Sequence, residues 1–246
     1  MNNQIYAIGD IHGELEQLHA AIAKIEKDSG PAARIVFLGD YIDRGAQSRQ
    51  VIEYLSDGLA AGNDWICLMG NHDRMLTLFM EDYPRTDIRF RVNYHWLHKR
   101  LGGRETLASY GVEIDDNDTI LSVHTRARAA VPQAHIDFIK SLQYHYEQDD
   151  LLFVHAGIRP GVPLDQQDHN DLIWIRDEFH DDTRTHPRLV IHGHTPVPEA
   201  THYGNRVNLD TGSGYGKPLT TAVFEGTNCW LLTETGRVPL LPDFLV

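Results

Sequence analysis

Residues 39–45, Gly-Asp-Tyr-Ile-Asp-Arg-Gly, place two carboxylates and a guanidinium in one short stretch that is closed by glycine at both ends. The stretch follows the apolar run of residues 35–38. Its polar side chains should therefore emerge where a buried strand ends and a loop begins, the usual place for chemistry in open α/β sheets. Two acids and a base this close together are rarely needed for packing alone. Asp40, Asp43 and Arg44 are thus the first candidates for a functional site.

Polar residues of similar kinds follow other apolar runs, and the first pair is Asp10 with His12. These two residues lie two positions apart at an extended strand end, so their side chains point to the same side and can bind one ion. Carboxylate and imidazole ligands suit a divalent metal of intermediate hardness, such as manganese, iron or zinc. The absence of thiolates from the pattern argues against a structural zinc site.

A second cluster is needed to account for Asn71, His155 and His194, which also follow apolar runs. These residues would supply the ligands of a second ion. Asp40 is central enough in the expected strand order to bridge two ions about 3.5 to 4 Å apart. The pattern therefore predicts a site for two divalent metal ions.

Strand and helix units are needed to position these side chains. Apolar runs at residues 4–8, 34–38 and 65–69 indicate buried strands, and each is followed by apolar residues at helical spacing. The polar positions after these runs are 30 and 31 residues apart, which is about the length of a βαβ unit. Near-continuous apolar character favours parallel strands with helices on both faces. The loops should then share one sheet edge, so that the polar residues converge.

The middle of the chain, residues 84–150, is predicted to form a helical cap region over the site. Apolar residues at helical spacing predict a helix through Ile88, Val92, Trp96 and Leu101 that ends at two glycines. Pro132 suits the start of another helix. We interpret the acidic stretch at residues 113–118 as a solvated turn, because it lacks the glycine and the terminal glutamate of a calcium loop.

The sheet pattern resumes in the last hundred residues. Apolar runs at 151–154 and 189–191 predict further buried strands. The segments at 207–209, 219–224 and 229–233 are typical of shorter strands joined by glycine-rich turns, and we expect them to complete the fold in antiparallel fashion. We interpret residues 1–246 as one α/β domain.

Composition restricts the classes of partner and the compartment. Thirty-five acidic residues against 22 Lys and Arg give a net charge of -13, which argues against non-specific binding of nucleic acid or of anionic membranes. No apolar run approaches the roughly 18 residues of a membrane span. Cys67 and Cys229 sit in apolar segments without disulfide spacing, which fits a reducing compartment. The first strand starts almost at Met1 and leaves no room for a cleaved leader. We therefore expect a cytoplasmic protein.

Taken together, the motifs resemble the bacterial metal-dependent phosphoprotein phosphatase family of the calcineurin-like metallophosphoesterases. That family's pattern reads GDxHG, GDxxDRG, GNH followed by an acid, HAG and GHTP. The chain carries it in this order at residues 9–13, 39–45, 70–73, 155–157 and 193–196. The match covers nearly the whole chain. It implies a sandwich of mixed β-sheets flanked by helices, with residues 84–150 as a helical cap region.

The resemblance also implies roles for single residues. It implies six metal ligands. Asp10 and His12 would bind one ion, and Asp40 would bridge the two ions. The ligands of the other ion would be Asn71, His155 and His194. It further implies that His72 is a general acid oriented by Asp43, and that Arg44 and Arg176 bind the phosphate.

The mechanism implied by the resemblance is direct attack of a metal-bridging hydroxide on phosphorus. Two cations, with manganese as the first choice and iron or zinc as alternatives, would lower the pKa of a bridging water enough to supply hydroxide near neutral pH. No covalent phosphoenzyme is required. His72 would protonate the departing oxygen, and the arginines would offset charge on the phosphoryl oxygens.

The substrate class can be interpreted in three ways, of which the first is preferred. Asp43-Arg44 and the form of residues 193–196 favour phosphate monoesters, chiefly phosphoserine or phosphothreonine proteins, with phosphotyrosine proteins as a variant. Met69 before the GNH motif, and Asp73 in place of the usual glutamate, favour a diadenosine polyphosphate hydrolase. A catalytically silent metal-binding regulatory module is the third alternative. It is disfavoured because His72, Asp43 and Arg44 are not needed to hold metal.

Two neighbouring features bear on the same site. His192 shares a motif with His194, and it can be either a ligand or a hydrogen-bond partner behind the ligands. Residues 212–216, Gly-Ser-Gly-Tyr-Gly, can be either a flexible turn or a loop that shapes the substrate mouth. In the second case Asp210 would orient the loop.

Overall fold

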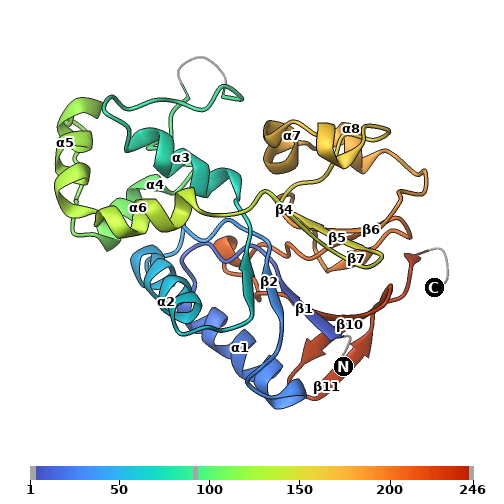
Figure 1. The fold of residues 1–246 in the computed structure, drawn as a ribbon. Helices are drawn as coiled ribbons and strands as arrows, with labels where there is room; N and C mark the ends of the chain where they lie inside the picture. The colour runs from blue at the N-terminus through green and yellow to red at the C-terminus, as the bar shows by residue number, and fades with distance from the viewer. Residues whose placement is uncertain (1–3, 91–93, 244–246) are drawn as a thin grey trace.

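Two β-sheets pack against each other in the computed structural model, which describes residues 4–90 and 94–243 (Figure 1). The strands of the first sheet are, in spatial order, β11 (Gly236–Pro239), β10 (Asn228–Thr233), β9 (Thr221–Glu225), β1 (Gln4–Ile8), β2 (Ile35–Phe37) and β3 (Trp65–Cys67). Those of the second sheet are β4 (His145–Gln148), β5 (Leu151–Val154), β6 (Leu189–His192), β8 (Arg206–Asn208) and β7 (Thr201–His202). The mixed sandwich expected from the sequence is therefore confirmed.

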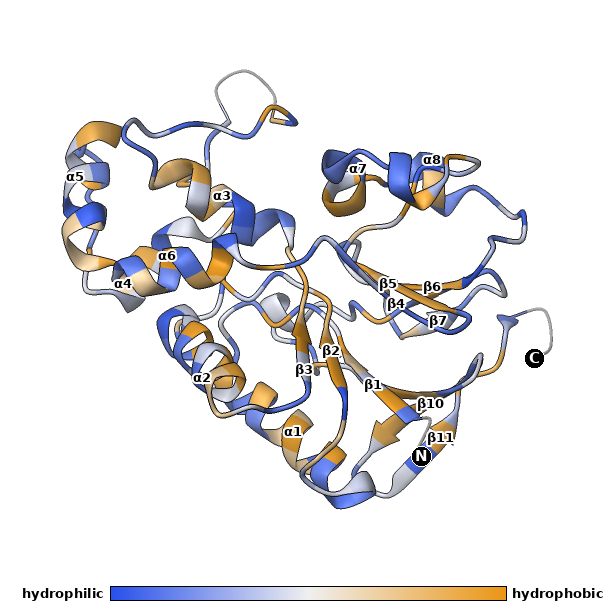
Figure 2. Cartoon of the chain, viewed as in Figure 1, coloured by the Kyte–Doolittle hydropathy of each residue, from blue (hydrophilic) through white to orange (hydrophobic). Residues whose placement is uncertain are grey.

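Alternation along the strands separates two apolar cores. In β1, Ile5 and Ala7 belong to the core between the two sheets, whereas Tyr6 and Ile8 belong to the core under the helices. Successive strand residues point to opposite faces, so a strand that is buried on both faces must be apolar throughout (Figure 2). The prediction of helices on both faces of the parallel strands was wrong, because the second sheet covers one of them.

Helices cover the outer face of each sheet (Figure 1). The first sheet carries α1 (Leu15–Ser29) and α2 (Ser48–Ala60), and the second carries α7 (His169–Trp174) and α8 (Asp177–His180). Two short 3-10 turns lie at Leu164–Gln166 and Ser213–Tyr215. Every helix in the described ranges is too short or too polar to cross a lipid bilayer.

Parallel pairing brings the carboxyl ends of the central strands to a common edge. β1, β2 and β3 run parallel in the first sheet, and β5, β6 and β8 run parallel in the second. The strand expected at residues 207–209 is β8, which pairs in parallel with β6 on one side and antiparallel with β7 on the other. Its predicted antiparallel pairing is therefore confirmed for one of its two neighbours. The predicted antiparallel completion is present in β9, which pairs with β1 and β10.

The described part of residues 84–150 holds three helices, which lie beside α3 (Asn71–Phe79). They are α4 (Gly103–Ser109), α5 (Ile120–Ala130) and α6 (Gln133–Lys140). The region is not helical to its end, because β4 pairs with β5 of the second sheet. The role of this region as a cap stays a prediction.

The helix predicted through residues 88–101 is not formed in the described part of that stretch, where turns replace it, and Val92 lies outside the described residues. Ile88, expected on the buried face, is 75% exposed. Trp96 is buried as expected, but in a turn, where its ring packs on Phe79 and its indole N–H donates to the carboxylate of Asp43. Specific tertiary contacts thus position Trp96 without a regular helix.

Candidate metal centre and active site

The six predicted metal ligands all lie at the common edge of the two sheets. They come from the segments that follow β1, β2, β5 and β6 and from the first turn of α3. None is more than 6% exposed: Asp10, His12, Asp40, Asn71, His155 and His194. Polar side chains with this degree of burial require partners.

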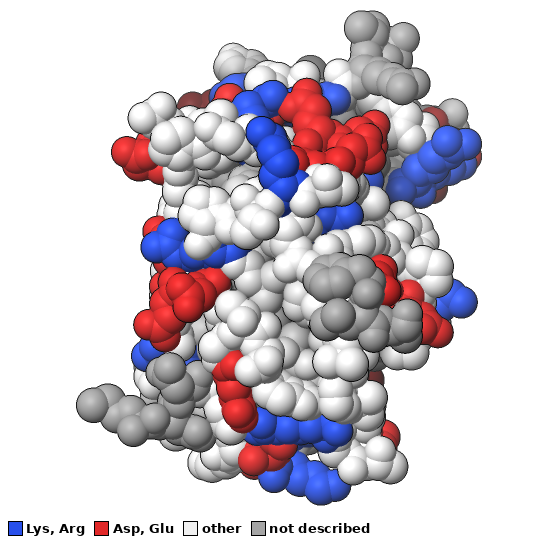
Figure 3. Space-filling model, turned by 90° about the vertical axis from the view of Figure 1, so that its right-hand side faces the viewer, with Lys and Arg blue, Asp and Glu red and all other residues white. Residues whose placement is uncertain are grey.

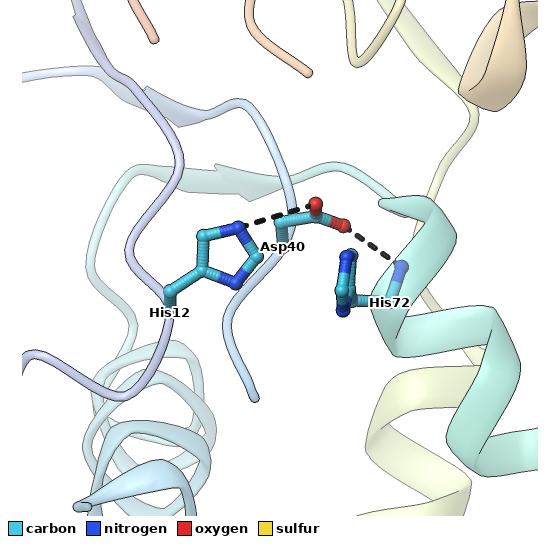
Figure 4. A group of neighbouring side chains, drawn as sticks. All are labelled: His12, Asp40 and His72. Atoms are coloured by element: carbon cyan, nitrogen blue, oxygen red, sulfur yellow. Dashed lines mark hydrogen bonds and ion pairs between the residues drawn. The ribbon is translucent and has the colours of Figure 1, made fainter. Parts of the chain in front are cut away.

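Two groups of side chains are arranged so that each could hold one metal ion. His12, Asp40 and His72 form the first, and Asp40, His155 and His194 form the second. Within each group the potential ligand atoms lie within 4.8 Å of one another. Figure 4 shows His12 and His72 on either side of the Asp40 carboxylate. Asp40 is thus the residue common to both groups, as its bridging role would require.

Hydrogen bonds fix the imidazole tautomers in a form that can bind metal. The Nδ1 atoms of His12 and His155 lie 2.8 Å from the carbonyl oxygens of Ile42 and Leu38, respectively. A carbonyl can only accept, so each Nδ1 carries the proton. In each neutral ring the lone pair is then left on Nε2. Histidine ligands are commonly oriented in this way by a bond from the other ring nitrogen.

Lone pairs that face one another mark the position for a cation. Nε2 of His155 lies 3.0 Å from Oδ1 of Asn71, and with the proton on Nδ1 both atoms are electron-pair donors. Nε2 of His194 is buried and has no hydrogen-bond partner within the described residues. Burial lowers the pKa of His155 and His194, which favours the neutral, ligating form. The donor set therefore fits a divalent metal.

Asp10 brings a further carboxylate to the centre. Its oxygens accept from the backbone N–H of His194 at 3.1 and 3.2 Å. Burial, Asp210 and Asp40 raise the pKa of Asp10. Burial also raises the pKa of Asp210, to about 6. The approach requires glycine at position 193, since a Cβ there would lie 2.0 Å from Asp10 Oδ1. Clustered buried carboxylates are best compensated by bound cations.

His72 and Asp43 form a buried pair. Nδ1 of His72 donates to Oδ2 of Asp43 at 2.6 Å. Asp43 is fully buried and also accepts from Trp96 Nε1 at 2.8 Å and from the Thr106 hydroxyl at 2.6 Å. These donors hold the carboxylate, and the carboxylate orients the imidazole. The geometry agrees with the expected orientation of a general acid. Trp96 and Thr106 belong to the middle region and carry no motif by which the sequence could reveal them.

Each of the two arginines lies beside a different ligand group. The guanidinium of Arg44 contacts Nε2 of His12, and it donates to Nε2 of His72 at 3.1 Å. Arg176 is exposed and donates to the Thr195 hydroxyl at 3.1 Å, one residue from His194. Burial, His155 and then the charge of Arg176 lower the pKa of His194. Both arginines are therefore close enough to act on an anion at the centre.

The loop at residues 212–216 is held against this centre. The Ser213 hydroxyl donates to the carbonyl of Asp10, and Asp210 Oδ1 accepts from the Gly212 N–H at 2.9 Å. Tyr215 is 60% exposed, and the Arg44 guanidinium lies 4.5 Å from the centroid of its ring. These contacts favour the interpretation of a loop at the substrate mouth, with Asp210 orienting it.

His192 contacts a different set of groups. Its Nδ1 lies 3.1 Å from the Gly193 carbonyl, and its Nε2 lies 3.3 Å from NH1 of Arg206. Its ring stacks on His180 at 5.6 Å. Within the described residues His192 belongs to neither potential metal group. These contacts favour a hydrogen-bond partner behind the ligand loop.

The site residues share an uncommon backbone conformation. Five of the six described non-glycine residues with positive φ belong to the site: His12, Asp40, Asp43, Arg44 and His194. Left-handed backbone costs about 1–2 kcal/mol per residue outside glycine. Hydrogen bonds between the loops maintain it, such as those from the N–H groups of Ile11 and His12 to the Asp40 carbonyl, at 3.1 and 2.8 Å.

Asp73 joins the loops that carry Asp40 and Asn71. Its fully buried carboxylate accepts from the backbone N–H groups of Asp40, Tyr41 and Gly70 at 2.8 to 2.9 Å. Burial and the Asp40 charge raise the pKa of Asp73, whereas these donors lower it. From the sequence, Asp73 in place of the usual glutamate favoured a diadenosine polyphosphate substrate. In the structure, however, the Asp73 carboxylate contacts the loop backbone.

Substitution Asp73→Asn is expected to lower the free energy of unfolding by about 2–3 kcal/mol. The reason is that an amide N–H₂ would face backbone N–H donors that are left unsatisfied. Urea denaturation measures the change. Asp116→Asn is the control, because that side chain is 78% exposed and its replacement should change stability by less than about 0.5 kcal/mol. Equal stabilities of the two variants would contradict the role of Asp73.

Comparison with known proteins adds an independent observation. The family model for the calcineurin-like phosphoesterases matches residues 4–215. The chain belongs to this family. The resemblance inferred from the five motifs is thereby confirmed. This calcineurin-like phosphoesterase is an enzyme of the metallophosphoesterase type, a superfamily that uses divalent metals.

Relatives within the family differ in their named substrates. The asymmetrical bis(5'-nucleosyl)-tetraphosphatase PrpE of Anoxybacillus flavithermus is 26% identical over 242 residues, covering 87% of each chain. A Schizosaccharomyces pombe protein provisionally named as a serine/threonine-protein phosphatase is 24% identical over 230 residues, covering 93% of this chain and 61% of that one. A crystal structure provisionally titled a diadenosine tetraphosphatase has a TM-score of 0.65 at 19% identity, over 97% of this chain and 94% of the other. The last match supports the fold alone.

Proposed function

We propose that this calcineurin-like phosphoesterase is a two-metal hydrolase that acts on dinucleoside polyphosphates. The observation that carries the two-metal reaction is the pair of potential ligand groups that share Asp40. His72 lies in one of these groups, but its Nδ1 is bound by Asp43, a pairing that suits a proton donor and that metal binding does not require. The arrangement suits attack by water on phosphorus and protonation of the group that leaves.

Each residue has a distinct task in this proposal. A bound pair of divalent ions, for which manganese is the first choice, supplies activation of water and compensation of phosphoryl charge. In this structure Nε2 of His72 accepts from Arg44, so the ring must bind a proton there before it can act as an acid. The imidazolium, which Asp43 stabilises through the bond to Nδ1, then gives this proton to the departing oxygen. Arg44 and Arg176 bind the phosphoryl oxygens and offset the charge that develops there.

Dinucleoside polyphosphates replace phosphoproteins as the preferred substrate class. Support comes from the PrpE relative, whose match extends over 87% of both chains. The phosphatase from Schizosaccharomyces pombe, together with Asp43-Arg44 in the motif, keeps phosphoproteins as the second candidate. The two relatives differ little in identity, so the substrate must be decided by measurement.

The surface charge is compatible with a small anionic substrate bound at a local site. In Figure 3, Lys and Arg alternate with Asp and Glu over the visible face. No extended cationic patch for a nucleic-acid backbone covers the described residues on that face. The positive charges that would bind the substrate are therefore the proposed metal ions together with Arg44 and Arg176.

Metal removal and a substrate panel test the proposal. Protein stripped by a chelator is expected to be inactive and to regain activity with about two equivalents of Mn²⁺ per chain. The panel is diadenosine tetraphosphate, a phosphoserine peptide, phosphotyrosine and glycerol phosphate. We expect the highest kcat/KM for the dinucleotide. A higher value for the peptide would establish the second candidate, and no turnover of any substrate would favour the silent regulatory module.

A further inference from the structure

Two aromatic side chains form a wall next to the second ligand group. The ring of Trp174, at the end of α7, lies 5.8 Å from the ring of His194. The ring of Phe90, in the loop after α3, lies 5.6 Å from that of Trp174. Both rings are partly buried. The wall therefore begins at a candidate metal ligand and extends away from it, and the proposed hydrolytic reaction does not use it.

Asp87 fixes the two rings relative to each other. Its buried carboxylate accepts from the indole N–H of Trp174 at 3.2 Å and forms an ion pair with Arg74 of α3 at 2.6 Å. It also accepts from the backbone N–H of Arg89 at 3.0 Å, and the N–H of Phe90 donates to the Asp87 carbonyl at 3.0 Å. One carboxylate thus joins α3, α7 and the turn that carries Phe90. The wall is preorganised before any ligand binds.

Charges around the wall are already paired. Asp171 of α7 binds Arg89 at 2.5 Å and Arg159 at 2.8 Å, while Arg74 is bound by Asp87. These three guanidinium groups are therefore engaged by buried carboxylates and are poorly suited to bind another phosphate. Two partly buried aromatic rings flanked by paired charges suit a flat, uncharged ring better than another phosphate.

We propose that Phe90 and Trp174 form the binding site for a nucleobase of the substrate. The inference rests on the function proposed above, because a phosphate chain that extends past His194 would bring its nucleoside to the wall. Stacking on aromatic side chains binds bases with little sequence preference, because every base has a π-face. The wall should thus favour nucleoside polyphosphates over phosphate esters that lack an aromatic group. A phosphotyrosine ring is the competing occupant.

Binding measurements on the Mn²⁺-loaded protein separate these outcomes without relying on turnover. We compare AMP, inorganic phosphate and phosphotyrosine by calorimetry for the wild type, Phe90→Leu and Phe90→Tyr. Phe90→Leu should weaken AMP binding about 5- to 100-fold and leave phosphate binding unchanged. Phe90→Tyr retains the π-face and should bind AMP as tightly as the wild type does. Tyr83→Leu is the matched control, because Tyr83 is 78% exposed and has no place in the wall.

Three results would overturn the inference. In the first, Phe90→Leu binds AMP as tightly as the wild type. In the second, the variant loses AMP binding and phosphate binding equally. In the third, the variant loses only the binding of phosphotyrosine. Failure of the proposed function has a different signature, which is a wild type that binds AMP but does not hydrolyse diadenosine tetraphosphate. If Phe90→Leu does not fold, as judged by circular dichroism, Phe90→Ile in the same titrations takes its place.

Discussion

Replacing Asp40 by asparagine is expected to reduce kcat at least about 10³-fold and to lower the metal content from about two ions to below one. Asp40 is the residue that both potential ligand groups share. Loss of an outer hydrogen-bond partner already costs about 10- to 100-fold in metal affinity, and loss of a shared anionic ligand should cost more at both positions. Lewis-acid stabilisation worth several kcal/mol would be lost with the ions.

Metal analysis after dialysis and steady-state kinetics measure these two effects. The asparagine amide oxygen can still accept from the backbone N–H of His72, a bond of 2.9 Å in the native site, so the fold should persist. The exposed Asp116→Asn variant controls for the loss of one negative charge. Asp40→Asn protein that retained two ions at native affinity would refute the bridging assignment.

Replacing His72 by asparagine is expected to lower kcat by about 10² to 10⁴, the range typical of a lost general acid, while two ions stay bound. The defect should shrink for p-nitrophenyl phosphate, because nitrophenolate leaves without protonation. The whole 10²- to 10⁴-fold loss of kcat should be seen with glycerol phosphate, whose alkoxide leaving group needs a proton. The ratio of the two rate losses therefore reports proton donation rather than a general disturbance of the site.

A competing role for His72 is built into the same geometry. Its ring nitrogen lies in one potential metal group with His12 and Asp40. If the asparagine variant loses one ion and both substrates lose rate equally, His72 is a ligand and the assignment as proton donor is wrong. Asp43→Asn offers a second comparison, since Asp43 contacts the His72 imidazole but is itself a member of no potential metal group in the described residues.

The positions of the site residues could be predicted from the sequence because they follow apolar runs. Asp10, Asp40 and Asn71 each follow a parallel strand, and parallel strands bring their carboxyl ends to one edge. The partners of Asp43 could not be predicted in this way. Trp96 and Thr106 come from a separate region, and single hydrogen bonds between distant segments leave no periodic signal.

The fold shows the same division between repeating and single contacts. The strand Gln4–Ile8 was predicted at its observed bounds, because its five residues are buried or nearly so. Helices were predicted on both faces of that strand, but the second sheet covers one face. An apolar face indicates burial and does not indicate whether a helix or a sheet packs against it. Helix α5 was missed. Only three of its eleven residues are buried, so its apolar face is weak.

The left-handed backbone at the centre has a consequence for which substitutions the fold can accept. Asp, Asn and His enter this conformation more readily than other non-glycine residues, and β-branched residues do so least. At His12, Asp40 and His194, glycine or asparagine should therefore give folded but inactive protein, whereas valine should also impair folding. A saturation library scored separately for abundance and for turnover would thus divide at these positions into substitutions that the backbone rejects and substitutions that only the chemistry rejects.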